Sequence, residues 1–287
     1  MNYVTGERLQ ELAEISVALN VESNFASDLV KTQLRNTRTE CVIFEQHITN
    51  TTIPDKLKFA KSIFVYPHIL DYFFNYIFPQ IESEFILITH NSDAGADERF
   101  KVYLDTPKIK KWFCQNKYFN HDKLFAIPIG LANSQWPHGN ILAFDSVVAE
   151  PYIKNNLVYK NFDMSTNPGQ RHHANHVTAQ NGFEMASSRP FHEYIRGIKQ
   201  SYFSFSPPGN GIDCHRIWEC LYLGCVPIVL KNTTSFGDFI DLPILFIDDF
   251  AEVTKEFLEQ QILKFHPFDP SSFNKLDLNY WKSLITN

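Results

Sequence analysis

Apolar residues recur along this chain in short continuous runs, and polar stretches separate the runs. Continuous apolar runs of this length are typical of strands that are buried on both faces of a parallel sheet. Two sets of such runs are present. The first set lies at 41–44 (CVIF), 62–66 (SIFVY), 85–89 (FILIT) and 124–130 (LFAIPIG), and the second lies at 157–162 (LVYKNF), 202–206 (YFSFS), 226–230 (VPIVL) and 244–247 (ILFI).

Segments with the spacing of amphipathic helices lie between the runs. Residues 1–16 place Leu9, Leu12 and Ala13 on one helical face. Further helices are predicted at 70–78, 107–115, 190–199, 216–223 and 253–265. Strands that alternate with helices are typical of an α/β protein built on parallel sheets.

The segment 137–156 separates the two sets of runs and is rich in residues that break regular structure. It holds Pro137, Gly139, Asn140 and Pro151. We therefore predict two α/β domains with a cleft between them. The predicted limits are 1–150 for an N-terminal domain, 151–270 for a C-terminal domain, and 271–287 for a C-terminal helix that can pack back on the first domain.

The composition fits a globular protein and narrows the function classes. The chain has 287 residues, of which 44% are hydrophobic and 20% are charged. The formal net charge of −6 disfavours nucleic-acid binding, which requires a basic face. The five cysteines show no CxxC spacing, which indicates reduced thiols in a cytoplasmic compartment. The most apolar window, 63–81, contains Pro67 and Asp71, so we predict no membrane span.

The densest candidate chemistry lies at 201–230, where two apolar runs flank a glycine-rich loop and a short helix. Glycines let backbone N–H groups approach a phosphate, and the start of the following helix favours negative charge. Arg216 adds a guanidinium that suits a pyrophosphate, and Glu219 can accept hydrogen bonds from a ribose. The residues predicted to bind a nucleotide here are Ser206, Pro207, Gly209, Asn210, Gly211, Asp213, His215, Arg216 and Glu219.

A simpler interpretation makes Arg216 and Glu219 an ion pair on the helix surface and leaves the glycines to form a turn. The presence of Trp218 in the same helix argues against it, because a solvated face needs no indole.

A second polar loop follows the run at 157–162. We expect its Thr166, Asn167 and Arg171 to complete the nucleotide site, and an ordinary surface turn is the alternative. The neighbouring histidines at 172, 173 and 176 lack a third ligand, so we predict no metal site.

Polar residues also follow two runs of the first half, and ligands bind at the carboxyl ends of parallel strands. Asp93 is the first candidate for a general base and His90 the second, while capping of the next turn is the alternative role for Asp93. Asn91, Trp136 and His138 are further candidate ligand-binding residues, and packing at a domain hinge is the alternative for Trp136 and His138.

The motifs S-P-P-G-N-G, R-I-W-E and L-G-C-V-P-I-V, followed by FGDFIDLPILFIDD, resemble the nucleotide-sugar half of exostosin-like glycosyltransferases. The resemblance covers 201–250 strongly and the remainder weakly. The lack of a membrane anchor differs from Golgi members of that family and is similar to the soluble xylosyltransferases of large algal viruses. On that resemblance we expect a cytoplasmic protein, in the host cytoplasm if it is viral.

The resemblance implies a GT-B fold, with two Rossmann-like domains and an interdomain cleft, and an inverting transfer from a UDP-sugar to a glycan hydroxyl. It implies that 1–150 is the acceptor-binding domain and 151–270 the nucleotide-sugar-binding domain. Asn91, Trp136 and His138 are then the candidate acceptor-binding residues. On this interpretation Arg216 binds the diphosphate and Glu219 the ribose. No Asp-x-Asp triplet occurs in the chain, so the implied reaction is metal-independent and needs no cofactor besides the UDP-sugar donor.

Two other functions fit the same motifs. A UDP-sugar epimerase can share the two-domain architecture, and a protein that has lost its base would bind nucleotide sugars or carbohydrates without catalysis. Xylose is the expected donor sugar from the viral resemblance, with glucuronate, galactose and N-acetylglucosamine as alternatives.

Overall fold

The chain divides into two compact units, which we describe one at a time. The computed structural model describes residues 1–20, 31–32, 36–45 and 52–286. The N-terminal unit comprises Asn2–Ile129 together with Leu278–Asn287. The C-terminal unit comprises Gly130–Asp277 together with Met1.

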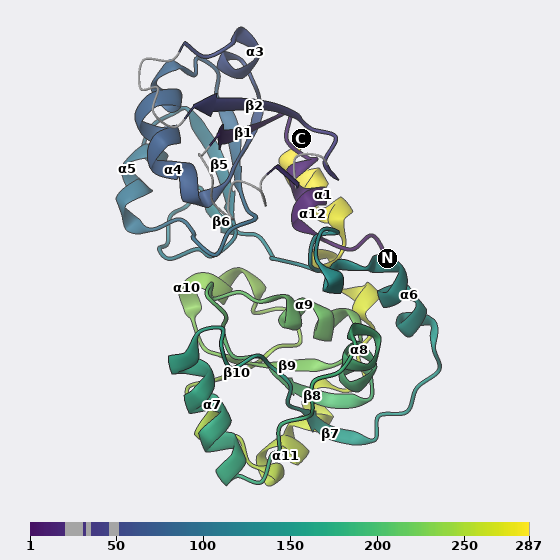
Figure 1. Cartoon of the computed structure of the whole chain (residues 1–287). Helices are drawn as coiled ribbons and strands as arrows, with labels where there is room; N and C mark the ends of the chain where they lie inside the picture. Colours follow the sequence, from purple (N-terminus) through teal and green to yellow (C-terminus); the bar gives the residue numbers. More distant parts are fainter. Residues whose placement is uncertain (21–30, 33–35, 46–51, 287) are drawn as a thin grey trace. The chain divides into compact units, whose positions relative to one another are not determined.

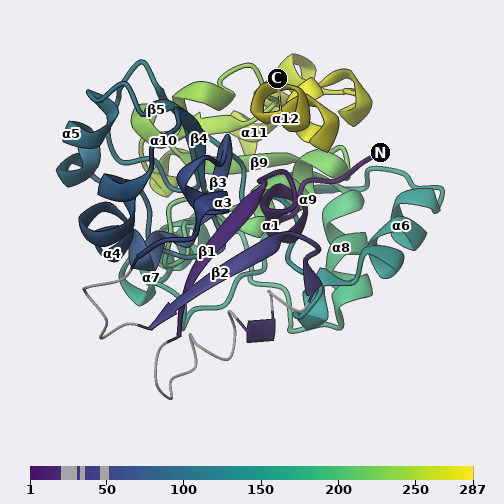
Figure 2. The ribbon, with the colours of Figure 1, turned by 90° about the horizontal axis from the view of Figure 1, so that it is seen from above.

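The N-terminal unit is built on a six-stranded parallel sheet with the order β2-β1-β3-β4-β5-β6. The order reverses at β1, as in doubly wound sheets, and β1 and β2 lie side by side (Figure 2). The strands are β1 (Ile15–Asn20), β2 (Glu40–Glu45), β3 (Ser62–Val65), β4 (Phe85–Thr89), β5 (Ile109–Cys114) and β6 (Leu124–Ala126).

Helices cover both faces of this sheet (Figure 1). Successive residues of a strand point to opposite faces. On one face the Trp112 ring of β5 lies 5.6 Å from the Phe74 ring, and on the other the Phe113 ring lies 6.4 Å from the Trp281 ring. The helical elements are α1 (Gly6–Gln10), α3 (Asp55–Lys58), α4 (Leu70–Tyr72) with its continuation through Phe73–Ile77 and Phe78–Gln80, α5 (Lys101–Leu104) and α12 (Leu278–Ile285).

Two sequence predictions for this unit are wrong. The helix predicted at 107–115 is strand β5, whose Trp112 and Phe113 are buried on both faces of the sheet. Aromatic residues in adjacent positions suit a central strand better than one face of a helix. The helix predicted at 1–16 is reduced to α1, and β1 begins at Ile15.

The C-terminal unit contains a four-stranded parallel sheet with the order β10-β9-β8-β7. The two parallel sheets confirm the prediction of an α/β protein. The elements are β7 (Asn156–Tyr159), α7 (Pro168–Gln180), α8 (Phe191–Lys199), β8 (Ser201–Phe205), α9 (His215–Tyr222), β9 (Val226–Leu230), α10 (Thr233–Phe236), β10 (Leu245–Ile247) and α11 (Lys255–Phe265), preceded by α6 (Ile141–Ala149).

Helices α7 and α11 lie on one side of this sheet, and α6, α8 and α9 lie on the other (Figure 1). The first side holds a continuous apolar core in which Ala174 of α7 and Leu258 of α11 pack with Phe203, Phe205 and the inward residues of β9 and β10. On the other side, Ile195 of α8 and Ile217 of α9 are fully buried. Helices therefore pack on both faces of this sheet, and the loops lie at the ends of its strands.

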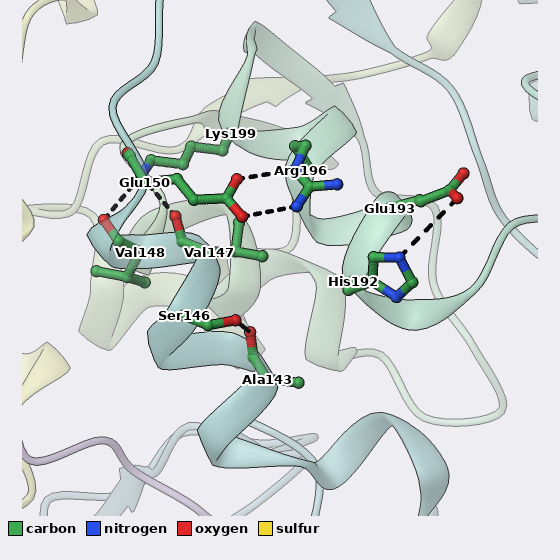
Figure 3. Close-up of polar contacts among 9 residues, drawn as sticks. All are labelled: Ala143, Ser146, Val147, Val148, Glu150, His192, Glu193, Arg196 and Lys199. Atoms are coloured by element: carbon green, nitrogen blue, oxygen red, sulfur yellow. Dashed lines mark hydrogen bonds and ion pairs between the residues drawn. The ribbon is translucent and has the colours of Figure 1, made fainter.

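The boundary between the units lies at Ile129/Gly130, before the predicted limit at residue 150. Polar contacts explain why α6 belongs to the C-terminal unit (Figure 3). The ammonium of Lys199 donates to the carbonyls of Val147 and Val148 at 2.7 Å and to that of Glu150 at 2.5 Å. The guanidinium of Arg196 donates two hydrogen bonds to the Glu150 carboxylate.

Among the residues that the structure describes, none of the helices combines the length and the apolar character needed to cross a bilayer. The side chains of Cys214, Cys220 and Cys225 are buried, as predicted for small apolar residues.

Candidate functional site

The candidate site of the C-terminal unit is formed by the loops that follow two adjacent strands. The glycine-rich loop at 206–213 follows β8, and the loop at 163–167 follows the strand beside it, β7. Parallel strands bring their carboxyl ends to one edge of a sheet, so the two loops lie together. The sequence predicted both loops, and the structure brings them into contact.

Arg171 and Asn167 join the two loops. The Arg171 side chain is buried, and its Nε donates to the Pro208 carbonyl at 3.0 Å while its Nη1 donates to the Asp163 carbonyl at 2.7 Å. Asn167 adopts a left-handed conformation and donates its amide to the Gly209 carbonyl at 2.8 Å. The side chains of Arg171 and Asn167 thus hold the glycine-rich loop in place. Both residues were predicted from the sequence to contact the ligand.

Gly209 lies between the side chains of Arg171 and Thr166. A side chain at this position would begin 3.4 Å from Nη2 of Arg171 and 3.6 Å from the Thr166 methyl group. Thr166 is therefore also at the contact between the loops. Three residues of the loop at 163–171 that were predicted for the site thus lie against the glycine-rich loop.

Helix α9 begins directly after the glycine-rich loop with uncapped amide groups. Its N-cap residue, Cys214, has extended backbone angles and no side-chain oxygen that could accept from the first turn. The free N–H groups of a helix start carry partial positive charge and attract anions. The first turn of α9 is thus suited to a phosphate group.

Arg216 lies in that first turn, where its side chain is half-buried and its Nε is buried. Its Nε has no hydrogen-bond partner among the described residues. The guanidinium carbon lies 5.9 Å from the Phe162 ring and 6.0 Å from the Tyr194 ring, so aromatic side chains flank it. Burial and the positive charge of Arg216 both lower the pKa of Arg171, which shows that the two guanidinium groups create a positive region.

Glu219 is buried on the same helix and is held by a residue from α8. Its Oε2 accepts a hydrogen bond from the Tyr194 hydroxyl at 2.8 Å. Burial raises the pKa of Glu219, while the Tyr194 hydrogen bond and the Arg216 charge act in the opposite direction. The alternative of a solvent-exposed ion pair between Arg216 and Glu219 is wrong, because Glu219 is buried.

Asp213 and His215 have structural contacts that the sequence did not reveal. The indole Nε1 of Trp218 donates to Oδ1 and Oδ2 of Asp213 at 2.8 and 2.9 Å. The His215 Nδ1 lies 2.8 Å from the Gly130 carbonyl, to which it donates. We assign the Asp213 carboxylate to holding Trp218 in the interior. The remaining predicted residues of the loop are Ser206, Pro207 and Gly211, which are buried, and Asn210, which is exposed.

Trp136 and His138 also lie in the C-terminal unit. Their rings are stacked with centroids 6.1 Å apart, and the His138 ring lies 6.0 Å from that of His215. Burial lowers the pKa of His138. These two predicted acceptor-binding residues therefore lie beside the start of α9.

The other predicted residues lie in the N-terminal unit, after β4. His90 is buried, and both ring nitrogens are engaged: Nε2 donates to the Pro128 carbonyl at 3.0 Å and Nδ1 accepts from the Asn91 amide at 2.7 Å. Burial lowers the pKa of His90. The Asn91 side chain donates to Oε1 of Gln10 at 3.2 Å.

Asp93 has an exposed side chain, and its carbonyl accepts from the Asn116 side chain at 3.1 Å. Of the two predicted bases, Asp93 is the one that solvent can reach. No group of three or more His, Cys, Asp or Glu side chains suited to a metal occurs within the described ranges.

Sequence reasoning missed Tyr194 and Phe162 as parts of the site. Phe162 was assigned only to an apolar run, and Tyr194 only to a helix. Nothing in their local spacing connects them to Arg216, because the Tyr194 contact arises from the packing of α8 against α9 and the Phe162 contact from the segment that follows β7.

Comparison of the chain with models of known protein families and with curated proteins gives no match. The function is therefore argued from the site.

Proposed function

We propose that the chain is a GT-B glycosyltransferase whose C-terminal unit binds a UDP-sugar donor. The observation that carries the proposal is the buried and unpartnered Nε of the Arg216 guanidinium, in the first turn of α9. A buried polar group without a partner costs about 1–3 kcal/mol, and more when it is charged. A diphosphate would supply both the missing acceptor and the opposite charge.

The surroundings of Arg216 support a nucleotide diphosphate rather than a small inorganic anion alone. The glycine-rich loop allows close approach of backbone N–H groups, and the loops are fixed by Arg171 and Asn167. Glu219 supplies a carboxylate one helical turn further along, where a ribose diol would be bound. The exostosin-like motifs at 201–250 favour UDP as the nucleotide.

The proposed reaction is an inverting transfer to a glycan hydroxyl. A base removes the proton of the acceptor hydroxyl, the oxygen attacks the anomeric carbon, and the bond to UDP breaks. Arg216 and the start of α9 would stabilise the negative charge that develops on the leaving diphosphate. The roles of Asp93 as base and of xylose as the donor sugar remain predictions. His90 is the weaker candidate, because its ring nitrogens are engaged in the fold.

The proposal is tested by calorimetric titration of UDP into the wild-type protein and into Arg216→Ala. Loss of the charge-assisted hydrogen bonds to the diphosphate is expected to weaken UDP binding by roughly 30-fold or more. Arg196→Ala is the matched control, because Arg196 lies in the adjacent helix but is already paired with Glu150. Equal UDP affinity of Arg216→Ala and the wild-type protein, with far-UV circular dichroism unchanged, would refute the assignment of the donor site.

A further inference from the structure

The amide of Gln135 is a second buried polar group without a partner in the C-terminal unit. Neither its Nε2 nor its Oε1 has a hydrogen-bond partner in the part of the chain that the structure describes. A side-chain amide has two donors and a carbonyl acceptor, and proteins satisfy nearly all such groups when they bury them. A fold that leaves both ends of an amide unpartnered loses stability, so the group calls for an explanation.

The loop that carries Gln135 is fixed by two consecutive turns. The Trp136 amide donates to the Asn133 carbonyl at 3.0 Å, and the Gly139 amide donates to the Trp136 carbonyl at 2.9 Å. A side chain at Gly139 would begin 1.9 Å from the Asn133 carbonyl oxygen, so only glycine fits there. The backbone on both sides of Gln135 is thus held in place.

This loop is fastened to the start of α9, where Arg216 lies. At the base of the loop, the Gly130 carbonyl accepts from Nδ1 of His215. Further along, the stacked rings of Trp136 and His138 bring the loop to the His215 ring at 6.0 Å. His215 directly precedes Arg216. The unpartnered groups of Gln135 and Arg216 therefore lie on segments that contact each other.

We propose that Gln135 is a ligand-binding residue of the donor site and contributes to its specificity. Its amide suits a ligand group that both donates and accepts hydrogen bonds. Two parts of a UDP-sugar have that chemistry: the imide edge of the uracil ring and the hydroxyl groups of the sugar. This inference rests on the proposed function, because it takes the ligand of Arg216 to be a UDP-sugar.

The test compares the wild-type protein with Gln135→Met, which keeps the length of the side chain and removes its polar atoms. Thermal unfolding without ligand is expected to give a Tm equal to or above that of the wild-type protein, since an unsatisfied amide is removed. Gln10→Met is the matched control. Gln10 is buried but donates to Ser16 and accepts from Tyr66, so its replacement leaves partners unsatisfied and lowers the Tm.

Calorimetry with pyrophosphate, UDP, UDP-xylose and UDP-glucose identifies the group that Gln135 binds. Gln135→Met is expected to bind pyrophosphate as the wild-type protein does, because Arg216 is intact. A loss of about tenfold in affinity for UDP and for both UDP-sugars assigns Gln135 to uracil. The same loss for the UDP-sugars alone assigns it to the sugar.

Two results would overturn the inference while leaving the proposed function in place. One is a Tm of Gln135→Met that falls as in Gln10→Met, which would show that the amide has partners within the fold. The other is wild-type affinity of Gln135→Met for UDP and both UDP-sugars. If the wild-type protein binds neither UDP nor pyrophosphate, the proposed function itself fails, and the Gln135 inference fails with it.

Discussion

The hydroxyl of Tyr194 donates a hydrogen bond to Oε2 of Glu219 over 2.8 Å, and this bond connects α8 to α9 next to the guanidinium of Arg216. Burial raises the pKa of Tyr194 well above its ordinary value, so the phenol keeps its proton and acts as the donor. The carboxylate is thereby fixed in orientation. Tyr194 is a positioning residue for Glu219 in the proposed donor site.

Tyr194→Phe is therefore expected to reduce both stability and UDP binding. Removing the donor to a buried carboxylate lowers the free energy of unfolding by about 1–3 kcal/mol. Urea unfolding measures this change, and calorimetry measures the accompanying loss of UDP affinity. Tyr202→Phe is the control, because the Tyr202 hydroxyl makes no hydrogen bond within the described chain and its ring contacts His266. Equal effects of the two substitutions would contradict the assigned role.

The buried Glu219 is expected to make stability depend on pH. Burial raises its pKa in the folded protein above the value in the unfolded chain, which is about 4.3. The folded state therefore holds the proton more tightly, and stability falls as the pH rises from the unfolded pKa through the folded one. Glu219→Gln removes this dependence but can still accept from Tyr194. Urea unfolding at pH 4 to 8 should show that the free energy of unfolding of Glu219→Gln increases relative to that of the wild-type protein as the pH rises. A difference that does not change with pH would contradict the assignment of this dependence to Glu219.

Arg171 is expected to act on the site by holding two loops rather than by charge alone. Its Nε and Nη1 donate to the carbonyls of Pro208 and Asp163, which belong to different loops. The ammonium of lysine does not reproduce this fork geometry. Arg171→Lys should therefore fail to restore what Arg171→Met loses, which is about 2–4 kcal/mol of unfolding free energy. Hydrogen exchange of the backbone amides at 209–212 should be faster in both variants. Wild-type protection of these amides in Arg171→Lys would show that the guanidinium is not needed to hold the two loops together.

The sequence predicted best those strands whose apolar residues are neighbours along the chain. Continuous apolar runs predicted β2, β3, β4 and β6 and all four strands of the C-terminal unit. A strand that is buried on both faces, such as β9, needs apolar residues at successive positions. The run at 109–114 was misassigned because two lysines interrupt it and give it the spacing of a helix. The loops of the candidate site followed from glycines and prolines at strand ends.

Contacts between segments that lie far apart in the chain could not be predicted from the sequence. The pairing of Tyr194 with Glu219 depends on how α8 packs against α9, and the unpartnered state of Gln135 depends on everything that surrounds it. The division between the two compact units lies at Ile129/Gly130, before the predicted limit at residue 150, for a similar reason. The breakers at 137–156 indicated a bridge, whereas the long side chain of Lys199 attaches α6 to the C-terminal unit.

Two cations of α8, Lys199 and Arg196, contact the C-terminal end of α6. Lys199 is buried and donates to three carbonyls at the end of α6, whereas Arg196 forms a partly exposed ion pair with Glu150 (Figure 3). Buried carbonyls that lose a charged donor are left unsatisfied, so Lys199→Met should lower the free energy of unfolding by about 2–3 kcal/mol. Exposed ion pairs contribute little, so Arg196→Ala should lower the free energy of unfolding much less than Lys199→Met does. Urea unfolding of both variants measures the contrast. An Arg196→Ala loss as large as that of Lys199→Met would mean that the ion pair, and not the buried lysine, secures α6.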